Sequence, residues 1–297
     1  MKKSFMELYN ELNSKFGVKI EEQQKKQKKM WYIAFGIYAI ILLLMIVSKV
    51  FMFIPFVTMF FFIITFIVIA LASNKATGGT SYYKENVINA LVTNVFEKAI
   101  YTHNIGIRPH EYNGKAFMER YYDRYNSEDL VVTHNEFNLT FSEVHTEDRQ
   151  EDSDGDTHYV TLFHGIYGYC NISKEINTNI CITSNRLFGG KTKVKMDMPE
   201  FEKTYDVYTD DKIVAVQLLT ADVMTELLDL KEKLGFMFEI VIERNQILFR
   251  IHSGNLFEMA VFKNSMGVER LHKYYNTLEH VEKITTMINK NIQELNI

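Results

Sequence analysis

A dense run of acidic residues in the middle of the chain is the first feature whose residue types could do chemistry. The segment EDRQEDSDGDT holds six carboxylates, namely Glu147, Asp148, Glu151, Asp152, Asp154 and Asp156. Carboxylate oxygens are the ligands that Ca²⁺ and Mg²⁺ prefer. A calcium-binding loop that started at Asp152 would need a glycine at its sixth position and a bidentate glutamate at its twelfth, where Phe163 stands. The interpretation we favour is therefore a solvated hairpin tip without a bound metal.

Histidines flank this acidic run on segments that alternate like half-buried strands. They are His134, His145, His158 and His164. Between these segments, Asp154-Gly155 is a hairpin-type turn signal. If the hairpin turns around Ser153-Asp154, His145 and His164 lie near each other, but a one-residue change of register puts one of them on the opposite face. Strand histidines without a matched ligand spacing are more often surface or hydrogen-bonded core residues than zinc ligands. A metal-dependent hydrolase that uses the acidic turn and the nearby histidines remains the alternative function.

The sequence contains none of the common catalytic motifs for phosphate cradling, metalloprotease action, thiol redox chemistry or serine hydrolysis. Cys170 and Cys181 are interpreted as small buried thiols in a reducing compartment, with a single disulfide as the other possibility. Tyr121, Tyr122 and Tyr125 form an aromatic cluster that core packing explains better than ligand stacking. We expect no catalytic residue, no cofactor and no enzymatic activity.

The elements that position these residues begin with an apolar segment near the N-terminus. The 297 residues are 47% hydrophobic and 24% charged, and the net charge of −4 argues against nucleic-acid binding, which needs a basic surface. From Met30 to Ala72 the only charged residue is Lys49. The two uncharged runs are Trp31–Val47 and Phe51–Ala72. A helix needs about twenty residues to cross a hydrocarbon core of ~30 Å, so each run is long enough for one crossing.

A hairpin of two transmembrane helices, at about residues 31–48 and 54–72, is the interpretation we favour. A cleaved signal peptide has a shorter apolar core and no second span directly behind it. A helix hairpin buried in a globular core is amphipathic, whereas these runs are apolar all round. The turn is expected near Ser48–Ile54, with Pro55 in the first turn of the second helix.

Basic residues predict the orientation of this hairpin. Before the first span stand Lys25, Lys26, Lys28 and Lys29. Lys75 and Lys84 follow the second span, whereas the turn between the spans offers only Lys49. Because basic loops stay on the cytoplasmic side, we expect both termini and the main domain of this multi-pass membrane protein on the cytoplasmic side. Spans without another ionisable residue do not favour a transporter or channel, because intramembrane charge usually marks a pathway.

The remaining segments indicate an α+β protein. Residues 1–29 hold a short amphipathic helix with a capping box at Ser4 and Glu7, followed by the basic segment. Residues 73–104 form a connecting amphipathic helix from about Ser81 to His103, and residues 105–297 form the cytoplasmic domain. Strands are predicted at Leu130–Val132, Phe137–Val144, His158–Tyr169, Asn179–Thr183, Tyr205–Tyr208, Ile213–Leu218, Phe236–Glu243 and Gln246–Ile251. The last two are predicted to form a hairpin that turns at Arg244-Asn245. Helices are predicted from Thr220 to Leu234 and from near Val268 onward. Strands grouped together, with helices at the ends, are typical of the α+β class.

Several short segments in one order resemble a bacterial family known as domain of unknown function 3137. They are Tyr122-Asp123-Arg124-Tyr125, Phe141-Ser142-Glu143-Val144-His145, Leu162-Phe163-His164-Gly165, Pro199-Glu200-Phe201-Glu202-Lys203, Val207-Tyr208-Thr209-Asp210-Asp211 and Leu218-Leu219-Thr220. The resemblance runs from about Tyr82 to the C-terminus, and an upstream pair of apolar helices is typical of such proteins. It implies a bacterial inner-membrane protein, and it supplies neither an activity nor catalytic residues.

The function expected from these observations is a membrane-anchored cytoplasmic binding or scaffold module. Its expected partners are the lipid bilayer and a protein that the sequence does not identify, with no nucleic acid. A strand-rich domain on an anchor, without a catalytic constellation, carries this expectation. Anchoring raises the local concentration of the domain at the membrane, so a modest affinity for the partner suffices.

Overall fold

The computed structural model describes residues 2–47, 79–134, 137–172, 174–184, 192–260 and 262–295. The chain divides into two units, which are described separately. The first unit comprises Met1–Lys2, Asn89–Phe257 and His272–Ile297, and we call it the sheet unit. The second comprises Lys3–Ile88 and Glu258–Leu271, and we call it the helical unit.

One antiparallel sheet of nine strands, counted over the described residues, organises the sheet unit. Its strands are β1 (Ala99–Thr102), β2 (Arg124–Thr133), β3 (Thr140–Glu151), β4 (Thr157–Asn171), β5 (Ile180–Thr183), β6 (Lys193–Val194), β7 (Asp206–Thr209), β8 (Phe238–Glu243) and β9 (Gln246–Ile251). Their order in the sheet is β1-β2-β3-β4-β9-β8-β5-β7-β6. The α+β class predicted from the sequence is confirmed for these residues.

Helices of the sheet unit connect and cover the strands. They are α4 (Asn89–Val95), the 3₁₀ turn η4 (Gly114–Phe117), α5 (Pro199–Glu202), α6 (Lys212–Leu218), α7 (Ala221–Leu234) and α8 (Val268–Glu294), of which the part from His272 belongs to this unit. The predicted ends of α7 are confirmed. Thr220 stands at its N-cap in an extended conformation, and Gly235 closes it with a φ of 71°, which an L side chain adopts only at a cost.

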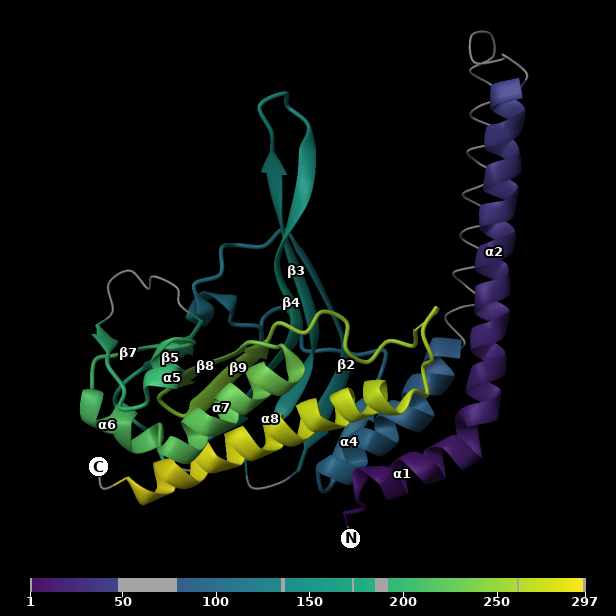
Figure 1. Cartoon of the computed structure of the whole chain (residues 1–297). Coiled ribbons are helices and arrows are strands. Elements are labelled where there is room, and N and C mark those ends of the chain that lie inside the picture. The colour runs from purple at the N-terminus through teal and green to yellow at the C-terminus, as the bar shows by residue number, and fades with distance from the viewer. Residues whose placement is uncertain are drawn as a thin grey trace. The chain divides into compact units, whose positions relative to one another are not determined.

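Helices α7 and α8 run across one face of the sheet (Figure 1). Aromatic residues of two strands point to this face: Phe238 of β8 stacks on Phe249 of β9 with ring centroids 5.5 Å apart. From α8, the Asn289 amide donates to the Cys170 Sγ of β4 at 3.6 Å. Successive residues of a strand point to opposite faces of the sheet. The neighbours of Phe238, Phe249 and Cys170 in their strands therefore point to the opposite face. We call the surface that α7 and α8 cover the helix face.

The opposite surface of the sheet is covered by irregular chain, and we call it the loop face. Ile107, Tyr112 and Phe117, from the segment between β1 and β2, are buried in one cluster with sheet residues such as Tyr167 and Leu248. Their backbone is fastened by side chains: the Ile107 N–H donates to a serine hydroxyl of β3 at 3.1 Å, and the Asn113 N–H donates to the Tyr167 hydroxyl at 3.1 Å. Side-chain acceptors therefore replace a strand or helix as partners of this segment.

Strands β3 and β4 extend beyond their neighbours as a two-stranded ribbon (Figure 1). The pairing of β2 with β3 stops at Arg124 and Glu147, and β9 pairs with β4 from Ile166 onward. Among the described strands, Asp148–Glu151 and Thr157–Val160 therefore pair only with each other. The turn lies where Asp154-Gly155 predicted it, with Gly155 at a φ of 84°.

In the helical unit, α1 (Phe5–Leu12), a π-helical turn (Asn13–Gly17) and α2 (Val18–Val47) follow one another without a break. The predicted capping box is present: the Glu7 carboxylate accepts from the Ser4 N–H at 2.9 Å, and the Glu7 N–H donates to the Ser4 hydroxyl. A second π-helical turn, Lys84–Ile88, carries a buried lysine that pairs with the Glu258 carboxylate at 2.5 Å.

Two predictions about helices are wrong. The connecting helix does not reach His103, because its last helical residue is Val95 and Lys98 takes a φ of 56°, after which β1 pairs with β2. The segment Ile213–Leu218 is helical in α6 rather than a strand. The Asp211 carboxylate accepts from two backbone N–H groups at the start of α6, and this cap outweighs the strand preference of the valines.

The predicted membrane segment is described only in part. Residues 31–47 of the first predicted span belong to α2, whereas the second span, at 54–72, lies outside the described residues. Within the described part of the chain, no helix meets the combined requirement of length and apolar character for crossing a bilayer.

Candidate functional site

A buried ionic network on the loop face is the most densely connected group of titratable side chains that we find in the sheet unit. Arg250 of β9 is 2% exposed and lies directly opposite Glu239 of β8. Its Nε donates to the Glu239 carboxylate at 2.5 Å, and its Nη1 donates to the Glu119 carboxylate at 3.1 Å. Both carboxylates are almost fully buried, so one guanidinium stands between two anionic groups.

Hydroxyl groups and an imidazole complete the partners of the two carboxylates. Glu239 accepts from the Thr183 hydroxyl of β5 at 2.5 Å and lies 3.0 Å from the His252 Nε2. Glu119 accepts from the Thr146 hydroxyl of β3 at 2.6 Å and from the Tyr112 hydroxyl. Buried carboxylates are stable only with such hydrogen bonds and a nearby positive charge.

Aromatic rings close the network on the side of the guanidinium. The Arg250 Cζ lies 4.6 Å from the centroid of the Phe117 ring and 5.3 Å from that of Phe163. The Phe163 ring also meets the His252 ring edge to face at 5.2 Å. These rings exclude water and leave His252, with 28% of its side chain exposed, as the partly open member of the network.

The environment shifts the pKa values of the acidic members in opposite directions. Burial alone raises the pKa of Glu239, but the hydrogen bond from His252 and the charge of Arg250 outweigh it and hold the pKa well below its ordinary value. Burial and the negative charge of Glu119 raise the pKa of the Tyr112 phenol far above its ordinary value. Tyr112 therefore stays a hydroxyl donor, and Glu239 stays a carboxylate, across the physiological pH range.

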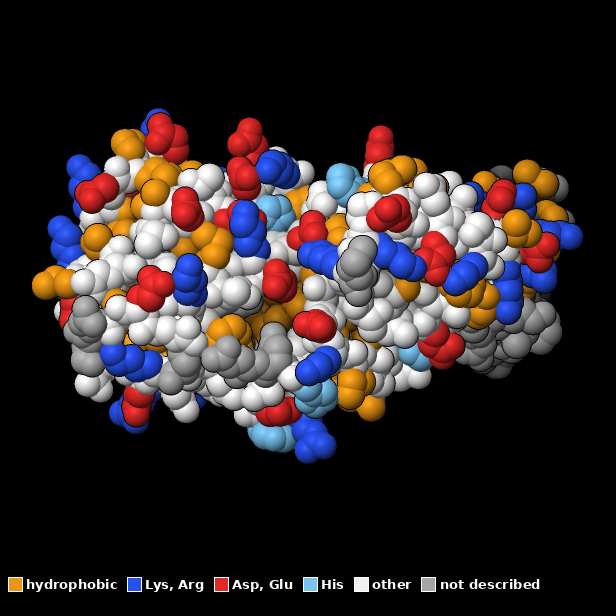
Figure 2. Space-filling model, turned by 90° about the horizontal axis from the view of Figure 1, so that it is seen from below, with side chains coloured by type: hydrophobic (Ala, Val, Ile, Leu, Met, Phe, Trp, Pro, Cys, Tyr) orange, Lys and Arg blue, Asp and Glu red, His pale blue; other side chains and the backbone are white. Residues whose placement is uncertain are grey.

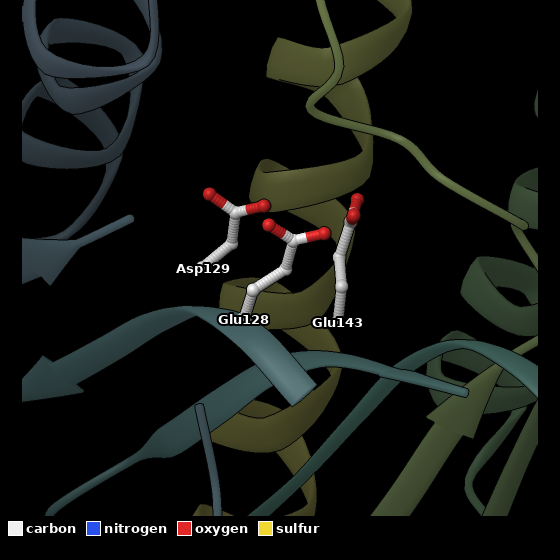
Figure 3. Close-up of side chains that lie close together, drawn as sticks. All are labelled: Glu128, Asp129 and Glu143. Atoms are coloured by element: carbon white, nitrogen blue, oxygen red, sulfur yellow. The ribbon is translucent and has the colours of Figure 1, made fainter. Parts of the chain in front are cut away.

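A second group, on the helix face, consists of three carboxylates. Figure 3 shows Glu128 and Asp129 from β2 beside Glu143 from β3. One carboxylate oxygen of each lies within 4.8 Å of the others, which is an arrangement that hard cations can use. Two of the three already serve the fold: the Glu143 carboxylate accepts from the N–H groups of Leu256 and Phe257, and Asp129 accepts from the Tyr101 hydroxyl. Asp129 also takes a φ of 60° at the irregularity in the β2–β3 register.

The predicted histidines separate into one pair and two single residues. His145 and His164 are direct cross-strand partners, so of the two registers left open the structure has the one that brings them together. His158 lies opposite Gln150 near the ribbon tip, and His134 lies near the end of β2.

The acidic turn satisfies its own backbone. The Asp152 carboxylate accepts from the N–H groups of Asp154 and Asp156 at 3.1 and 3.0 Å. Glu151 lies six residues beyond His145 on β3, or about 20 Å at ~3.3 Å per residue. The carboxylates from Glu151 to Asp156 are therefore too far from the histidine pair to share one ion with it, as the alternative hydrolase requires, whereas Glu147 of the same acidic run lies 3.9 Å from the His145 Nε2.

The cysteines and the tyrosine cluster differ in how well the predictions describe them. Cys170 and Cys181 are free and buried, as expected, and burial raises the pKa of the Cys170 thiol to about 12, which makes it a poor nucleophile. Tyr125 packs against Tyr112 in the loop-face core, with ring centroids 5.6 Å apart. Tyr121 is 80% exposed, so core packing does not describe that residue.

A polar pocket of about 370 Å³ lies along α7 and α8. Its lining includes the buried Glu226 carboxylate, which pairs with His280 at 2.5 Å and with Lys283, and the ion pair between Lys2 and Glu279. Acidic and basic side chains are interspersed over the face of the molecule in Figure 2, so this view shows no surface of a single charge sign.

The ionic network was not predicted from the sequence, although the pairing of Glu239 with Arg250 could have been. The predicted turn at Arg244-Asn245 already places Glu239 opposite Arg250, two opposite charges at positions where a buried hairpin carries apolar side chains. The contribution of Glu119 had no local signal, because it is 131 positions from Arg250 in the chain.

The fold and site together define an α+β protein with a large antiparallel sheet, in which the described residues show no catalytic signature. Residues 161–290 match the model of a family described as "Protein of unknown function (DUF3137)", and this match supports membership of that family for this part of the chain. This confirms the resemblance seen in the sequence.

Two further comparisons add little to this identification. No curated protein matches the chain. Among solved structures, a crystal structure of the mycobacterial trehalose monomycolate transport factor A, TtfA, is similar at 10% sequence identity and a TM-score of 0.34, over 67% of this chain and 93% of that one. No property of TtfA is carried over at this level of similarity.

Proposed function

We propose that this chain is a membrane-anchored binding module that holds its sheet unit at the cytoplasmic face of a bacterial inner membrane. The anchor is the transmembrane hairpin at about residues 31–48 and 54–72. Its support is the charge pattern: two uncharged runs that are each long enough for one crossing, with lysines before the first and after the second. Both termini and residues 105–297 then lie on the cytoplasmic side.

The observation that carries a binding role is the ribbon of β3 and β4. It extends beyond the other strands, so its two edges present backbone groups that no described strand pairs (Figure 1). An isolated two-stranded ribbon buries little apolar surface and adds little to stability. Such an element is explained more readily by contact with another molecule than by the needs of the fold.

The base of the ribbon adds side chains of the type found at protein interfaces. Tyr121 is 80% exposed and stacks on Tyr122 with centroids 5.8 Å apart, and Tyr159 of β4 is 38% exposed. The Arg124 guanidinium lies 3.3 Å from the centroid of the Tyr159 ring. Tyrosine and arginine are, with tryptophan, enriched at the energetic centres of protein interfaces. The partner that fits this surface is another protein.

Fractionation of lysed cells tests the anchor. We expect the full-length chain in the membrane pellet after a high-salt wash, because burial of apolar helices does not depend on ionic strength. A matched variant that lacks residues 31–72 is expected in the supernatant. Recovery of the full-length chain in the supernatant without detergent contradicts the anchor.

Site-specific photo-crosslinking tests the binding surface. A photoreactive amino acid at Tyr159 is expected to give a discrete crosslinked product in cells, whereas the same probe at the exposed Glu232 of α7 gives none. Arg149 and Tyr159 are cross-strand partners, so the sequence Asn-Gly can replace residues 150–158 as a two-residue turn. A probe at Tyr121 is expected to lose its crosslinks in this shortened chain. Unchanged crosslinks in a folded shortened chain contradict a role for the ribbon.

A further inference from the structure

The segment that joins β9 to α8 lies against α2, and both segments belong to the helical unit. The Gln24 side chain of α2 is buried, and its amide donates to the Ala260 carbonyl at 2.7 Å and to the Lys263 carbonyl. The Ser265 hydroxyl donates to the Ala260 carbonyl at 3.0 Å. One buried amide thus holds both ends of a short turn against the helix. We call residues 260–265 the α2-bound loop.

The α2-bound loop presents a large apolar side chain to the outside. Phe262 stands between the two carbonyls that Gln24 holds, and it is 56% exposed. Its ring meets the Tyr32 ring of α2 edge to face, with centroids 6.4 Å apart, and Tyr32 is also exposed. An ordered loop that exposes an aromatic ring beside a second exposed ring is explained by contact with another surface, because neither ring serves the core.

The position of these rings along α2 indicates which surface they meet. Tyr32 is the second residue of the first proposed span, and Gln24 lies eight residues, or about 12 Å, before it on the helix. The α2-bound loop therefore extends along α2 to the level where the proposed span enters the bilayer. Aromatic rings are favoured at that level, because the headgroup region accommodates an apolar ring beside polar groups.

The charges around the rings are complementary to an anionic lipid surface. Lys263 of the α2-bound loop is exposed. On α2, Lys28 and Lys29 precede Tyr32 by four and three residues, so they lie on the same side of the helix as its ring. No acidic residue follows Glu22 within α2. Lysines at this level can lay their stems along apolar surface and reach lipid phosphates with their charged ends.

We propose that the α2-bound loop is a second point of membrane contact, at which the Phe262 ring inserts between the headgroups of an anionic bilayer and Lys263 pairs with lipid phosphate. The inference rests on the anchor proposed above, because it takes the level of the bilayer from the first span. It goes beyond the anchor, because the contact lies in the C-terminal half of the chain, between β9 and α8. The chain is then held at the bilayer at two places that are far apart in the sequence.

Depth-dependent fluorescence quenching of the full-length chain in lipid vesicles tests the proposal. Trp31 is the only tryptophan of the chain, so Trp31→Phe combined with Phe262→Trp places a single fluorophore in the α2-bound loop. The vesicles contain phosphatidylcholine and phosphatidylglycerol at about 3:1. We expect phosphatidylcholine brominated just below the headgroup to quench roughly half of the emission, and lipid brominated near the end of the acyl chain to quench less.

Val18→Trp in the same Trp31→Phe background is the matched control. Val18 is 73% exposed and lies on α2 about 20 Å before the start of the proposed span. Its fluorophore is therefore expected to escape quenching by either lipid. Equal quenching of the probes at Val18 and Phe262 overturns the proposal, because proximity to lipid is then not specific to the α2-bound loop.

The wild-type chain in the same vesicles separates failure of this inference from failure of the anchor. Quenching of Trp31 without quenching of the probe at Phe262 overturns the loop contact and leaves the anchor intact. If Trp31 also escapes quenching and the chain does not float with the vesicles, the anchor fails and this inference fails with it.

Photo-labelling of the wild-type chain in these vesicles gives a readout that needs no variant. Phosphatidylglycerol with a photoactivatable group near its headgroup is expected to label the peptide that contains Phe262 and Lys263, in addition to peptides from residues 31–72. Mass spectrometry after proteolysis locates the adducts. Labels confined to residues 31–72 overturn the proposal.

Discussion

The two faces of the nine-stranded sheet are stabilised by different interactions. On the helix face, α7 and α8 bury aliphatic and aromatic side chains such as Leu278 and Phe249, whose contribution grows with buried area and needs no particular geometry. On the loop face, the segment between β1 and β2 is held by Arg250, the two carboxylates beside it and a set of hydroxyl donors. An apolar interface tolerates small shifts, whereas a buried ion network does not, because each unpaired member is costly.

Because the two faces are stabilised differently, substitutions on the loop face are expected to lower the free energy of unfolding most strongly. Apart from the 3₁₀ turn η4, the segment between β1 and β2 has few helix or strand hydrogen bonds, so side chains such as Ser142 and Tyr167 serve as partners of its backbone. On the helix face, by contrast, many apolar contacts share the stabilisation. The predictions below compare the two faces from the largest expected effect to the smallest.

Arg250→Met is expected to destabilise the sheet unit most, by about 3–5 kcal/mol, because it leaves Glu119 and Glu239 buried without a positive partner. The measurement is chemical denaturation of the full-length chain monitored by circular dichroism. A variant that also carries Glu119→Gln and Glu239→Gln serves as the matched control and is expected to recover much of the loss. A loss below about 1 kcal/mol for Arg250→Met shows that the carboxylates are not held by the guanidinium.

Leu278→Ala in α8 tests the helix face with a comparable reduction of buried side chain. Leu278 is fully buried, so the loss of transfer free energy and the cavity together are expected to cost about 3 kcal/mol. This variant is expected to leave the protease resistance of residues 105–123 unchanged, whereas Arg250→Met exposes them to cleavage. Limited proteolysis with mass spectrometry separates the two outcomes. Equal cleavage of that segment in both variants contradicts the division into two independently stabilised faces.

Sequence reasoning described the two faces unequally for a physical reason. The caps of α7 and the turn at Asp154-Gly155 are local signals, so this helix and this hairpin could be predicted, whereas the register that makes His145 and His164 cross-strand partners stayed open. The prediction from local signals was wrong at Ile213–Leu218. The valines there favour a strand, but the N-cap at Asp211 stabilises a helix. The loop face depends on residues far apart in the chain, and no period or motif in the sequence indicates which of them meet.

Tyr112→Phe removes one hydroxyl donor from Glu119 and keeps the ring that packs in the loop-face core. We expect a loss of about 1–2 kcal/mol, because a buried carboxylate loses one of several hydrogen bonds. Tyr125→Phe is the matched control, since its hydroxyl donates to the Ile107 carbonyl at 2.7 Å and not to a charged group, and it is expected to cost less. The same denaturation measurement ranks the two. A larger loss for Tyr125→Phe shows that the ring contacts, not the ion network, dominate on this face.

The acid dependence of stability sharpens the comparison further when a Glu239 variant is compared with the wild type, because the Glu239 carboxylate lies on the loop face. The pKa of Glu239 is lowered by folding, so its contribution is fully present above its ordinary value of 4.5 and is lost as the pH falls toward the folded-state pKa. Each such group changes the unfolding free energy by at most about 1.4 kcal/mol per pH unit in that window. Glu239→Gln is therefore expected to have a lower free energy of unfolding at pH 6 but a flatter decline between pH 4.5 and 3.5 than the wild type. Glu232→Gln, on the exposed surface of α7, keeps the wild-type slope. If both variants retain that slope, the Glu239 carboxylate does not gain its stabilisation from Arg250 and His252, and the loop face depends on packing as the helix face does.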